Sequence, residues 1–491
     1  MTSLFHLSPA FETSHALLSS YLEQHTLYQD VLNKTLRELE EEYTGATQIL
    51  NVLLEAQRLI MLHESGLHEN IVFFQFYQLN SLQSWSDYPT PPVADDLISS
   101  LAEKMYNLNP AKNDYAMIQT DEGVSAIVEE VVERLVKQGD KWNITFKDHL
   151  FKARLFDSIT DEGLEHVADY TLSLWEPVTT RIAIVPGLPP TDLPDIDKDK
   201  ETRFQKMTET ISNKIRSGEI HFTLTCIPTM RDAEFDNIPY PDYLTLFFEM
   251  CDQPWEHINT AHQFLIGKLD SGKTLRFTNE DGTDLSMSID GMTFANSIIA
   301  RNVPGSEVFS APVKDSVNGK VVAKGHFSPA GLYRGERVED ITLIFKDGKC
   351  IDADARIGKD ILMKMIGTDE GSCYVGEIGI GTNPHLKQRV ANILLVEKIS
   401  GSFHIALGAA YSSKEYMGVP VNIDNGNHSQ IHWDITTLLY GKKGCIYLDD
   451  TLLMKNGLYL APELEVLNKG WACIPDTDRP DYWKDYKFNT L

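Results

Sequence analysis

The chain has 491 residues, of which 42% are hydrophobic, so it is long enough for two or three globular domains with their own cores. Its formal net charge of -27 argues against nucleic acid and anionic membranes as partners, because both are bound through Lys and Arg. The sequence contains no bilayer-spanning apolar run, no signal peptide pattern and no Cys-x-x-Cys spacing among its six cysteines, so we expect a cytoplasmic protein.

Residues 1–95 are expected to form a helical extension. Apolar residues recur at helical spacing from Ser14 to Leu62, with a break at Thr44-Gly45, which predicts a helical hairpin. The proline-rich stretch 84–92 predicts a linker, because proline interrupts both helices and strands. Two roles stay open for the extension: it tunes access or assembly from the outside, or it completes the core of the first domain.

Residues 96–290 alternate between helical and strand patterns, which predicts an α/β domain with a mainly parallel sheet. The expected helices are 120–137, 164–175 and 198–216, followed by more than one helix over 242–268. The expected strands are 142–146, 181–185 and 221–226. Neither Gly-x-Gly-x-x-Gly after a strand nor Gly-x-x-x-x-Gly-Lys-Ser/Thr occurs, so a nucleotide site is unsupported.

Residues 291–491 are expected to form a strand-rich α+β domain that carries the chemistry. Asn-Gly and Asp-Gly dipeptides favour the positive φ angles of hairpin turns, and they separate alternating runs at 318–319, 347–348 and 456–457. Just before this region, a turn at 279–282 lies between two further short strands. These patterns predict antiparallel pairing.

Two histidines and an aspartate in this region could hold a metal. Side chains two positions apart on a strand share a face, so His432 and Asp434 project together. His404 begins a similar strand, and the small residues Ala406 and Gly408 on its face leave room for an ion or substrate. A His-x-Asp pair alone is more often an ordinary hydrogen-bonded pair, so a metal site needs further ligands.

Two glutamates supply such ligands. Glu307 and Glu377 each lie in a short apolar strand, where a solvated carboxylate is unexpected. Burying an unpaired carboxylate costs several kcal/mol, so a bound cation is the simplest explanation for both.

The motifs together resemble the thermophilic aminopeptidase family of metallopeptidases, of the aminopeptidase T and aminopeptidase S type. The resemblance rests on Asn-x-Pro-x-x-Glu-Val-Phe from Asn302, Gly-Glu-Ile at 376–378, Glu-Lys-Ile-x-Gly-x-x-His-Ile-Ala-Leu-Gly from Glu397, and His-x-Asp at 432–434. It covers about residues 100–470. It implies as metal ligands Glu307, Glu377, His404, His432 and Asp434, with Glu397 as a sixth that requires a short insertion before His404.

The resemblance also implies two divalent metal ions, short peptides with a free N-terminus as substrates, and a homodimer. Charge counting agrees with two ions, because they would balance four carboxylates when both imidazoles are neutral. Oxygen and nitrogen ligands suit zinc, cobalt, manganese or magnesium. We expect Glu377 to bridge the ions, Glu307 or Glu377 to act as general base on an activated water, and Tyr411 to stabilise the oxyanion.

The sequence therefore predicts a metal-dependent aminopeptidase that hydrolyses the N-terminal peptide bond of small peptides. Two alternatives stay open. A different dinuclear hydrolase, such as an amidase, could use the same ligands, because a metal site does not define its substrate. A non-catalytic binding homologue is the other, although candidate ligands in every motif argue against it.

Overall fold

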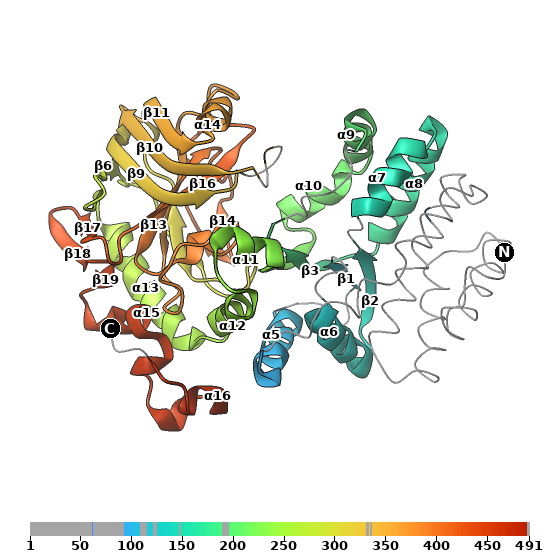
Figure 1. The fold of residues 1–491 in the computed structure, drawn as a ribbon, viewed down its shortest axis with the longest axis horizontal. Helices are drawn as coiled ribbons and strands as arrows, with labels where there is room; N and C mark the ends of the chain where they lie inside the picture. The colour runs from blue at the N-terminus through green and yellow to red at the C-terminus, as the bar shows by residue number, and fades with distance from the viewer. Residues whose placement is uncertain are drawn as a thin grey trace. The chain divides into compact units, whose positions relative to one another are not determined.

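The computed structural model describes Met61 and residues 93–108, 115–120, 125–146, 149–188, 196–329, 333 and 336–488. The chain divides into two compact units (Figure 1), one containing residues 98–186 and 190–224, the other containing 92–97, 187–189 and 225–491. The predicted helical extension and linker, residues 1–95, lie almost entirely outside the described residues.

The first unit contains a sheet with helices packed around it. The strands, in the sheet order β2-β1-β3-β4, are β1 (Tyr115–Thr120), β2 (Lys141–Phe146), β3 (Thr180–Pro186) and β4 (His221–Ile227). The helices are α5 (Asp95–Asn107), α6 (Ser125–Gln138), α7 (His149–Ser158), α8 (Asp161–Trp175), α9 (Lys198–Met207) and α10 (Glu209–Ser217). Because β1 pairs in parallel with both β2 and β3, the predicted α/β character of this region is confirmed.

This unit differs from the sequence expectation in its helices and in one strand. Helices α5 and α7 were not predicted. Strand β1 was not predicted, because its fully buried run Ala116–Ile118 is too short to show a periodicity. The expected single helix 198–216 is two helices. Thr208 separates them, since its φ of -99° and ψ of 9° depart from helical values and its N–H closes the first helix on the carbonyl of Phe204.

The second unit contains two large antiparallel sheets and the two-stranded antiparallel sheet β14-β15. The larger has the order β11-β10-β9-β6-β5-β17-β18-β19, and the smaller has the order β16-β13-β12-β8-β7. The strands are β5 (Thr274–Thr278), β6 (Asp284–Ser288), β7 (Ala295–Ser297), β8 (Glu307–Ser310), β9 (Asn318–Phe327), β10 (Val338–Lys346), β11 (Lys349–Ile357), β12 (Val375–Gly381), β13 (Ser402–Gly408), β14 (Glu415–Tyr416), β15 (Val419–Pro420), β16 (His432–Leu438), β17 (Cys445–Leu448), β18 (Thr451–Lys455) and β19 (Leu458–Tyr459). The helices are α11 (Met230–Asp236), α12 (Tyr240–Cys251), α13 (Trp255–Ser271), α14 (Lys359–Ile366), α15 (Glu465–Lys469) and α16 (Asp481–Lys484).

Three of the predicted turns are confirmed and one is wrong. The turn at 279–282 joins the antiparallel strands β5 and β6. Residues 347–348 join β10 to β11, and residues 456–457 join β18 to β19. Asn318 and Gly319 do not form a turn, because β9 begins at Asn318 and pairs with β6. Gly319 has a φ of 113°, and a Cβ there would overlap the backbone of Asp284, so this glycine permits a close approach of two strands.

The core of the second unit is formed by both sheets together with α13. Phe277 of β5 stacks on Phe403 of β13 with ring centroids 4.2 Å apart. Ile258, Leu265 and Leu269 on one face of α13 belong to the same core. Because this helix packs into the strand-rich unit, the two units divide near residue 225, whereas the boundary expected from the sequence was residue 290.

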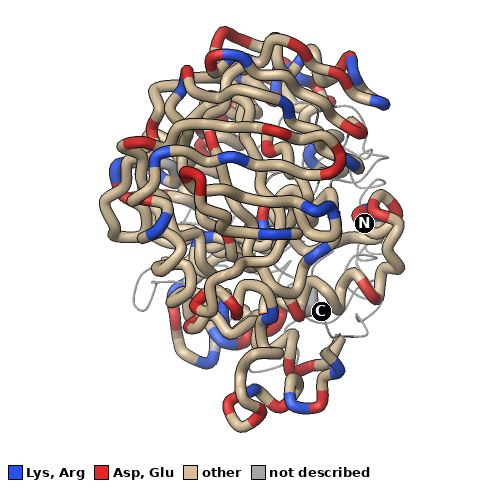
Figure 2. Tube along the Cα trace, turned by 90° about the vertical axis from the view of Figure 1, so that its left-hand side faces the viewer, with Lys and Arg blue, Asp and Glu red and all other residues tan. Residues whose placement is uncertain are grey.

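Basic residues are interspersed among the acidic ones along the described trace (Figure 2). Acidic residues predominate over the whole sequence, with 71 Asp and Glu against 44 Lys and Arg, so the absence of a nucleic-acid partner stays a prediction based on charge. Within the described ranges, none of the helices combines the length and apolar character needed to cross a bilayer.

Candidate metal centre

One face of the smaller sheet collects the five main candidate ligands. Glu307 begins β8, Glu377 lies in β12, His404 lies in β13, and His432 and Asp434 lie in β16. The antiparallel register pairs Glu307 with Gly381, His404 with Gly379, Asp434 with Ala406 and His432 with Gly408. Directly paired residues share a face of a sheet, as do residues two positions apart, so all five side chains project from one side.

The residues between these ligands are small, which keeps that side of the sheet open. A Cβ at Gly379 would overlap the His404 ring, so only glycine fits between β13 and β8 at this level. On the opposite side, Ile378, Ile405 and Trp433 are buried in the core. A one-residue slip of any of these strands would bury the ligands in the apolar layer, so core packing fixes the register that assembles the site.

The five side chains form two clusters that share Glu377. Glu307, Glu377 and His404 bring ligand atoms within 4.8 Å of one another, and so do Glu377, His432 and Asp434. The Nε2 atom of His404 lies 3.7 Å from a Glu307 oxygen and 3.5 Å from a Glu377 oxygen. The Nε2 atom of His432 lies 3.1 Å from the other Glu377 oxygen and 3.7 Å from Asp434.

The two imidazoles are held differently. The Nδ1 atom of His432 lies 2.8 Å from the backbone oxygen of Ala409, and donation to that oxygen leaves Nε2 facing the cluster. Such a bond on the far nitrogen is typical of metal-binding histidines. His404 is fully buried, and its Nδ1 atom has no hydrogen-bond partner among the described residues.

A buried lysine, which was not predicted, adjoins the first cluster. Lys398 follows Glu397 in the 3-10 helix Val396–Lys398, directly before β13. Its Nζ atom lies 2.5 Å from Glu307 Oε1 and 2.7 Å from Glu397 Oε2, and its side chain has no exposed surface. The predicted sixth ligand, Glu397, is therefore paired with this ammonium and lies outside both clusters. The sequence signal for Lys398 was the charged pair Glu397-Lys398 inside the otherwise apolar run Ile393–Ile399.

The charged groups of the site shift one another's pKa values. Burial acts to raise the pKa of Glu377, but His404 and His432 outweigh it and lower the pKa to about 2. Burial acts to lower the pKa of both imidazoles, but the carboxylates raise it to about 9 for His404 and about 10 for His432. Burial, with Asp434 and Glu307, raises the pKa of Glu397 to about 8 against the effect of Lys398.

The pKa of Lys398 is raised above its usual value as well. Burial acts to lower it, but Glu307 and Glu397 outweigh this effect. The first cluster thus already has a cation, the Lys398 ammonium, paired with one of its carboxylates. In the second cluster, the ion pairs of the described residues give Asp434 no basic partner except His432.

Tyr411 lies at the edge of the same site. Its ring centroid is 5.4 Å from that of His432 and 5.3 Å from that of Phe309, and 46% of its surface is exposed. The nearby carboxylates, Glu377 first, raise the pKa of Tyr411 well above its usual value, so the phenol keeps its proton as a donor.

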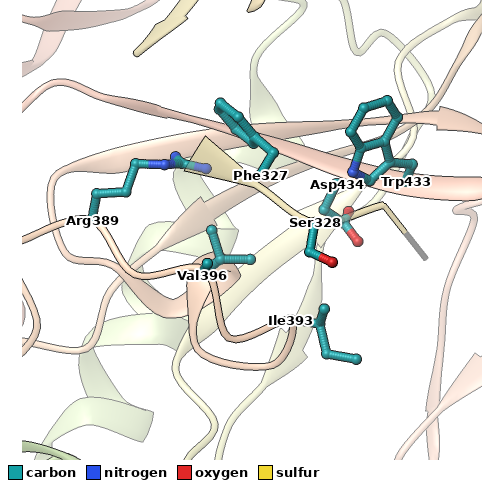
Figure 3. A pocket seen from close by; sticks show the side chains of 8 residues that line it. Phe327, Ser328, Arg389, Ile393, Val396, Trp433 and Asp434 are labelled. Carbon is teal, nitrogen blue, oxygen red and sulfur yellow. The ribbon is translucent and has the colours of Figure 1, made fainter. Parts of the chain in front are cut away.

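A small cavity of about 40 Å³ adjoins the second cluster. Asp434 lines it together with Ser328, Val396 and the aromatic side chains Phe327 and Trp433 (Figure 3). This volume is enough for water molecules beside the Asp434 carboxylate.

The ligand atoms of the two clusters fit a divalent metal. Glu307 Oε2, Asp434 Oδ1 and both ring nitrogens of His404 are buried and have no hydrogen-bond partner within the described residues. Unsatisfied buried polar atoms are costly, and a metal ion would satisfy those that face the clusters. Carboxylate oxygens and imidazole nitrogens are suitable donors for such an ion.

A chain of polar residues that the sequence analysis missed supports Glu307 from behind. The hydroxyl groups of Ser306 and Thr382 lie 2.9 Å apart, and Thr382 is 2.7 Å from Nε2 of the buried His262. His262 Nδ1 lies 2.7 Å from Asn296 Oδ1, and burial lowers the pKa of this histidine to about 4. His262 therefore stays neutral, and through Thr382 it is linked to Ser306, the residue before Glu307.

Comparisons with known proteins agree with this geometry. A sequence model of the family described as thermophilic metalloprotease (M29) matches residues 96–442, a span that includes every candidate ligand. The chain is similar to Aminopeptidase AmpS of Bacillus subtilis, with 37% identity over 115 residues, which are 23% of this chain and 27% of that protein. It is also similar to Aminopeptidase T of Thermus thermophilus, with 26% identity over 275 residues, or 50% of this chain and 66% of that protein.

The fold is similar to that of a solved structure, wild-type AmpT from Thermus thermophilus. The match has a TM-score of 0.57 at 20% identity and covers 74% of this chain and 99% of the other. The chain matches less than two thirds of the length of the curated relatives AmpS and Aminopeptidase T. The family match, in contrast, spans more than half of the chain and contains both clusters, and the chain belongs to the M29 family of thermophilic metalloproteases.

Proposed function

We propose that this protein is a metal-dependent aminopeptidase that hydrolyses the N-terminal peptide bond of small peptides. The proposal rests on the two clusters of carboxylates and imidazoles that share Glu377. Several of their buried ligand atoms have no hydrogen-bond partner among the described residues. The aminopeptidase names of the relatives support the same reaction.

The metal-binding residues in this proposal are those of the two clusters. Glu307, Glu377 and His404 form the first site, and Glu377, His432 and Asp434 form the second. Zinc, cobalt, manganese or magnesium suits such donors. A bound divalent ion would polarise the scissile carbonyl and lower the pKa of a water molecule. Glu397 is the proposed sixth ligand, and it would first have to leave Lys398.

The protein's own side chains would move the protons of the reaction. Glu307 or Glu377 would accept a proton from the water whose oxygen adds to the carbonyl carbon, and would deliver it to the leaving amine as the C–N bond breaks. Glu307 Oε2 has no hydrogen-bond partner among the described residues, so it can take this proton when no ion is bound to it. Tyr411 would donate a hydrogen bond to the oxyanion of the tetrahedral intermediate.

The second cluster is the more open of the two and is the proposed place of substrate approach. The side chains of His432 and Asp434 are 30% and 16% exposed, whereas those of Glu307 and His404 are 5% and 0% exposed. Negative side chains here would attract the positively charged N-terminus of a peptide.

We also propose that the protein is a cytoplasmic homodimer, as the family resemblance implies, and that the catalytic residues all lie within residues 291–491. Sedimentation of the full chain tests the dimer, and a monomeric mass at micromolar concentration would contradict it.

A matched pair of tripeptides tests the proposed function. The purified protein should release the first residue from a tripeptide with a free N-terminus and leave the N-acetylated copy intact. Equal cleavage of both peptides would favour an amidase or an endopeptidase, and cleavage of neither would favour a binding protein.

A further inference from the structure

The most unusual feature of the site is the ammonium group of Lys398. It is fully buried and lies 2.5 Å from Glu307 and 2.7 Å from Glu397. A buried lysine is stable only when its charge is paired, and both of its partners here are acidic residues that the metal prediction had assigned to ions. The charge count that balanced four carboxylates with two divalent ions did not include the positive charge of Lys398.

The position of Lys398 is fixed by its surroundings. The residue ends the 3-10 helix Val396–Lys398, and its backbone carbonyl accepts the N–H of Asn383. The next residue, Ile399, is fully buried. The backbone at Lys398 is thus anchored beside Glu307, and the ammonium cannot reach solvent by a simple rotation of an exposed side chain.

Lys398 makes the two clusters unequal. A divalent ion bound to the free oxygen of Glu307 would share one carboxylate with a buried ammonium, and repulsion between such cations is little screened inside a protein. The second cluster is free of this conflict, because Lys398 has no ion pair with Glu377 or Asp434 in the described part of the chain.

The histidines show the same inequality. His432 in the second cluster is oriented by its bond to Ala409, whereas a metal on His404 Nε2 would leave its Nδ1–H buried without a partner among the described residues. Loss of such an orienting bond typically weakens metal binding about 10 to 100-fold.

We propose that Lys398 takes the place of one of the two cations, so that the centre holds a single tightly bound divalent ion, at Glu377, His432 and Asp434. This inference rests on the proposed function, because it concerns the same metal centre. The first cluster then binds a second ion only weakly, with a dissociation constant about 100-fold higher.

The test is metal stoichiometry in the full-length protein. Wild-type protein is stripped with a chelator, reloaded with Co²⁺, passed over a desalting column and analysed for metal per chain by mass spectrometry. We expect one ion in the wild type and two in Lys398→Gln, where a second cation is needed to balance Glu307 and Glu397. Lys398→Arg, which keeps the charge, should hold one ion, as should the surface control Lys469→Gln. The same samples loaded with Mn²⁺ should give the electron paramagnetic resonance spectrum of isolated ions in the wild type and a spin-coupled spectrum in Lys398→Gln.

The outcomes separate this inference from the proposed function. Two tightly bound ions in the wild type, or one ion in Lys398→Gln, would overturn the role of Lys398 and leave a metal-dependent peptidase intact. One ion in the wild type and two in Lys398→Gln without peptide cleavage by either would support the inference and overturn the aminopeptidase. No ion in any protein would overturn both. If Lys398→Gln does not fold, the wild-type count and the Mn²⁺ spectrum still decide.

Discussion

Replacing Glu377 by glutamine removes the carboxylate that both clusters share while keeping its volume. Glu377 is 4% exposed, and its two oxygens face the Nε2 atoms of His404 and His432 at 3.5 and 3.1 Å. The variant Glu377→Gln should therefore lose metal from both clusters at once, because a neutral amide is a far weaker ligand for a hard divalent ion.

The effect on the metal-free protein follows from the pKa of Glu377. This pKa falls from 4.5 to about 2 in the folded state, and the difference corresponds to roughly 3 kcal/mol at about 1.36 kcal/mol per pH unit. Since the folded-state pKa is lowered, this stability is present above pH 4.5 and is lost as the pH falls towards 2. At pH 7 the metal-free variant should be less stable than metal-free wild type by at most about 3 kcal/mol.

Three measurements on one preparation check this reasoning: metal per chain, urea unfolding without metal, and release of the N-terminal residue from a tripeptide. Turnover should fall by about 10²-fold or more. Glu463→Gln, which changes an exposed carboxylate in the same unit, serves as the control and should match the wild type. A Glu377→Gln protein that keeps the wild-type metal content and most of its turnover would refute a shared ligand at this position.

Three further predictions concern other residues of the second unit. His432→Ala and Asp434→Ala should each lower both bound metal and activity, whereas His404→Ala should lower activity and the binding of a weak second ion while one ion stays bound. Full metal occupancy in the His432 and Asp434 variants would remove the site as described. Tyr411→Phe should lower kcat by about 10²-fold with unchanged metal content, since only an oxyanion donor is removed; a loss of metal would assign the tyrosine to metal binding instead. The lowered pKa of His262, about 4 instead of 6.5, means that folding stability is complete above pH 6.5 and falls by about 3 kcal/mol as the pH drops to 4. Unfolding of His262→Gln across this range should show a correspondingly flatter dependence, and parallel curves for the two proteins would contradict a neutral buried histidine.

Much of the site could be predicted because strand periodicity is local. Alternation in β13 and β16 places His404, His432 and Asp434 on a polar face with small neighbours, and the apolar context of Glu307 and Glu377 marks them as unusual. The family resemblance then assigned these residues as metal ligands, and the structure brings all five together.

The features that the sequence did not reveal depend on contacts between distant segments. Lys398 looked like an ordinary charged residue, and its pairing with Glu307 spans 91 positions of the chain. His262 lies on a helix whose burial in the second unit is set by tertiary packing, so its contact with Thr382 had no local signal. Gly319 resembled a turn residue, because a positive φ serves a close strand contact and a hairpin equally well.

The most direct test of the central claim is to follow metal binding and peptide hydrolysis in the same titration. Chelated wild-type protein is titrated with Co²⁺ while bound metal and release of the N-terminal residue from a tripeptide are measured in parallel. We predict that the chelated protein is inactive, that activity rises in proportion to metal bound at the clusters around Glu377, and that it levels off when they are filled. Hydrolysis that persists after complete removal of metal would contradict the account, as would full metal binding without any release of amino acid.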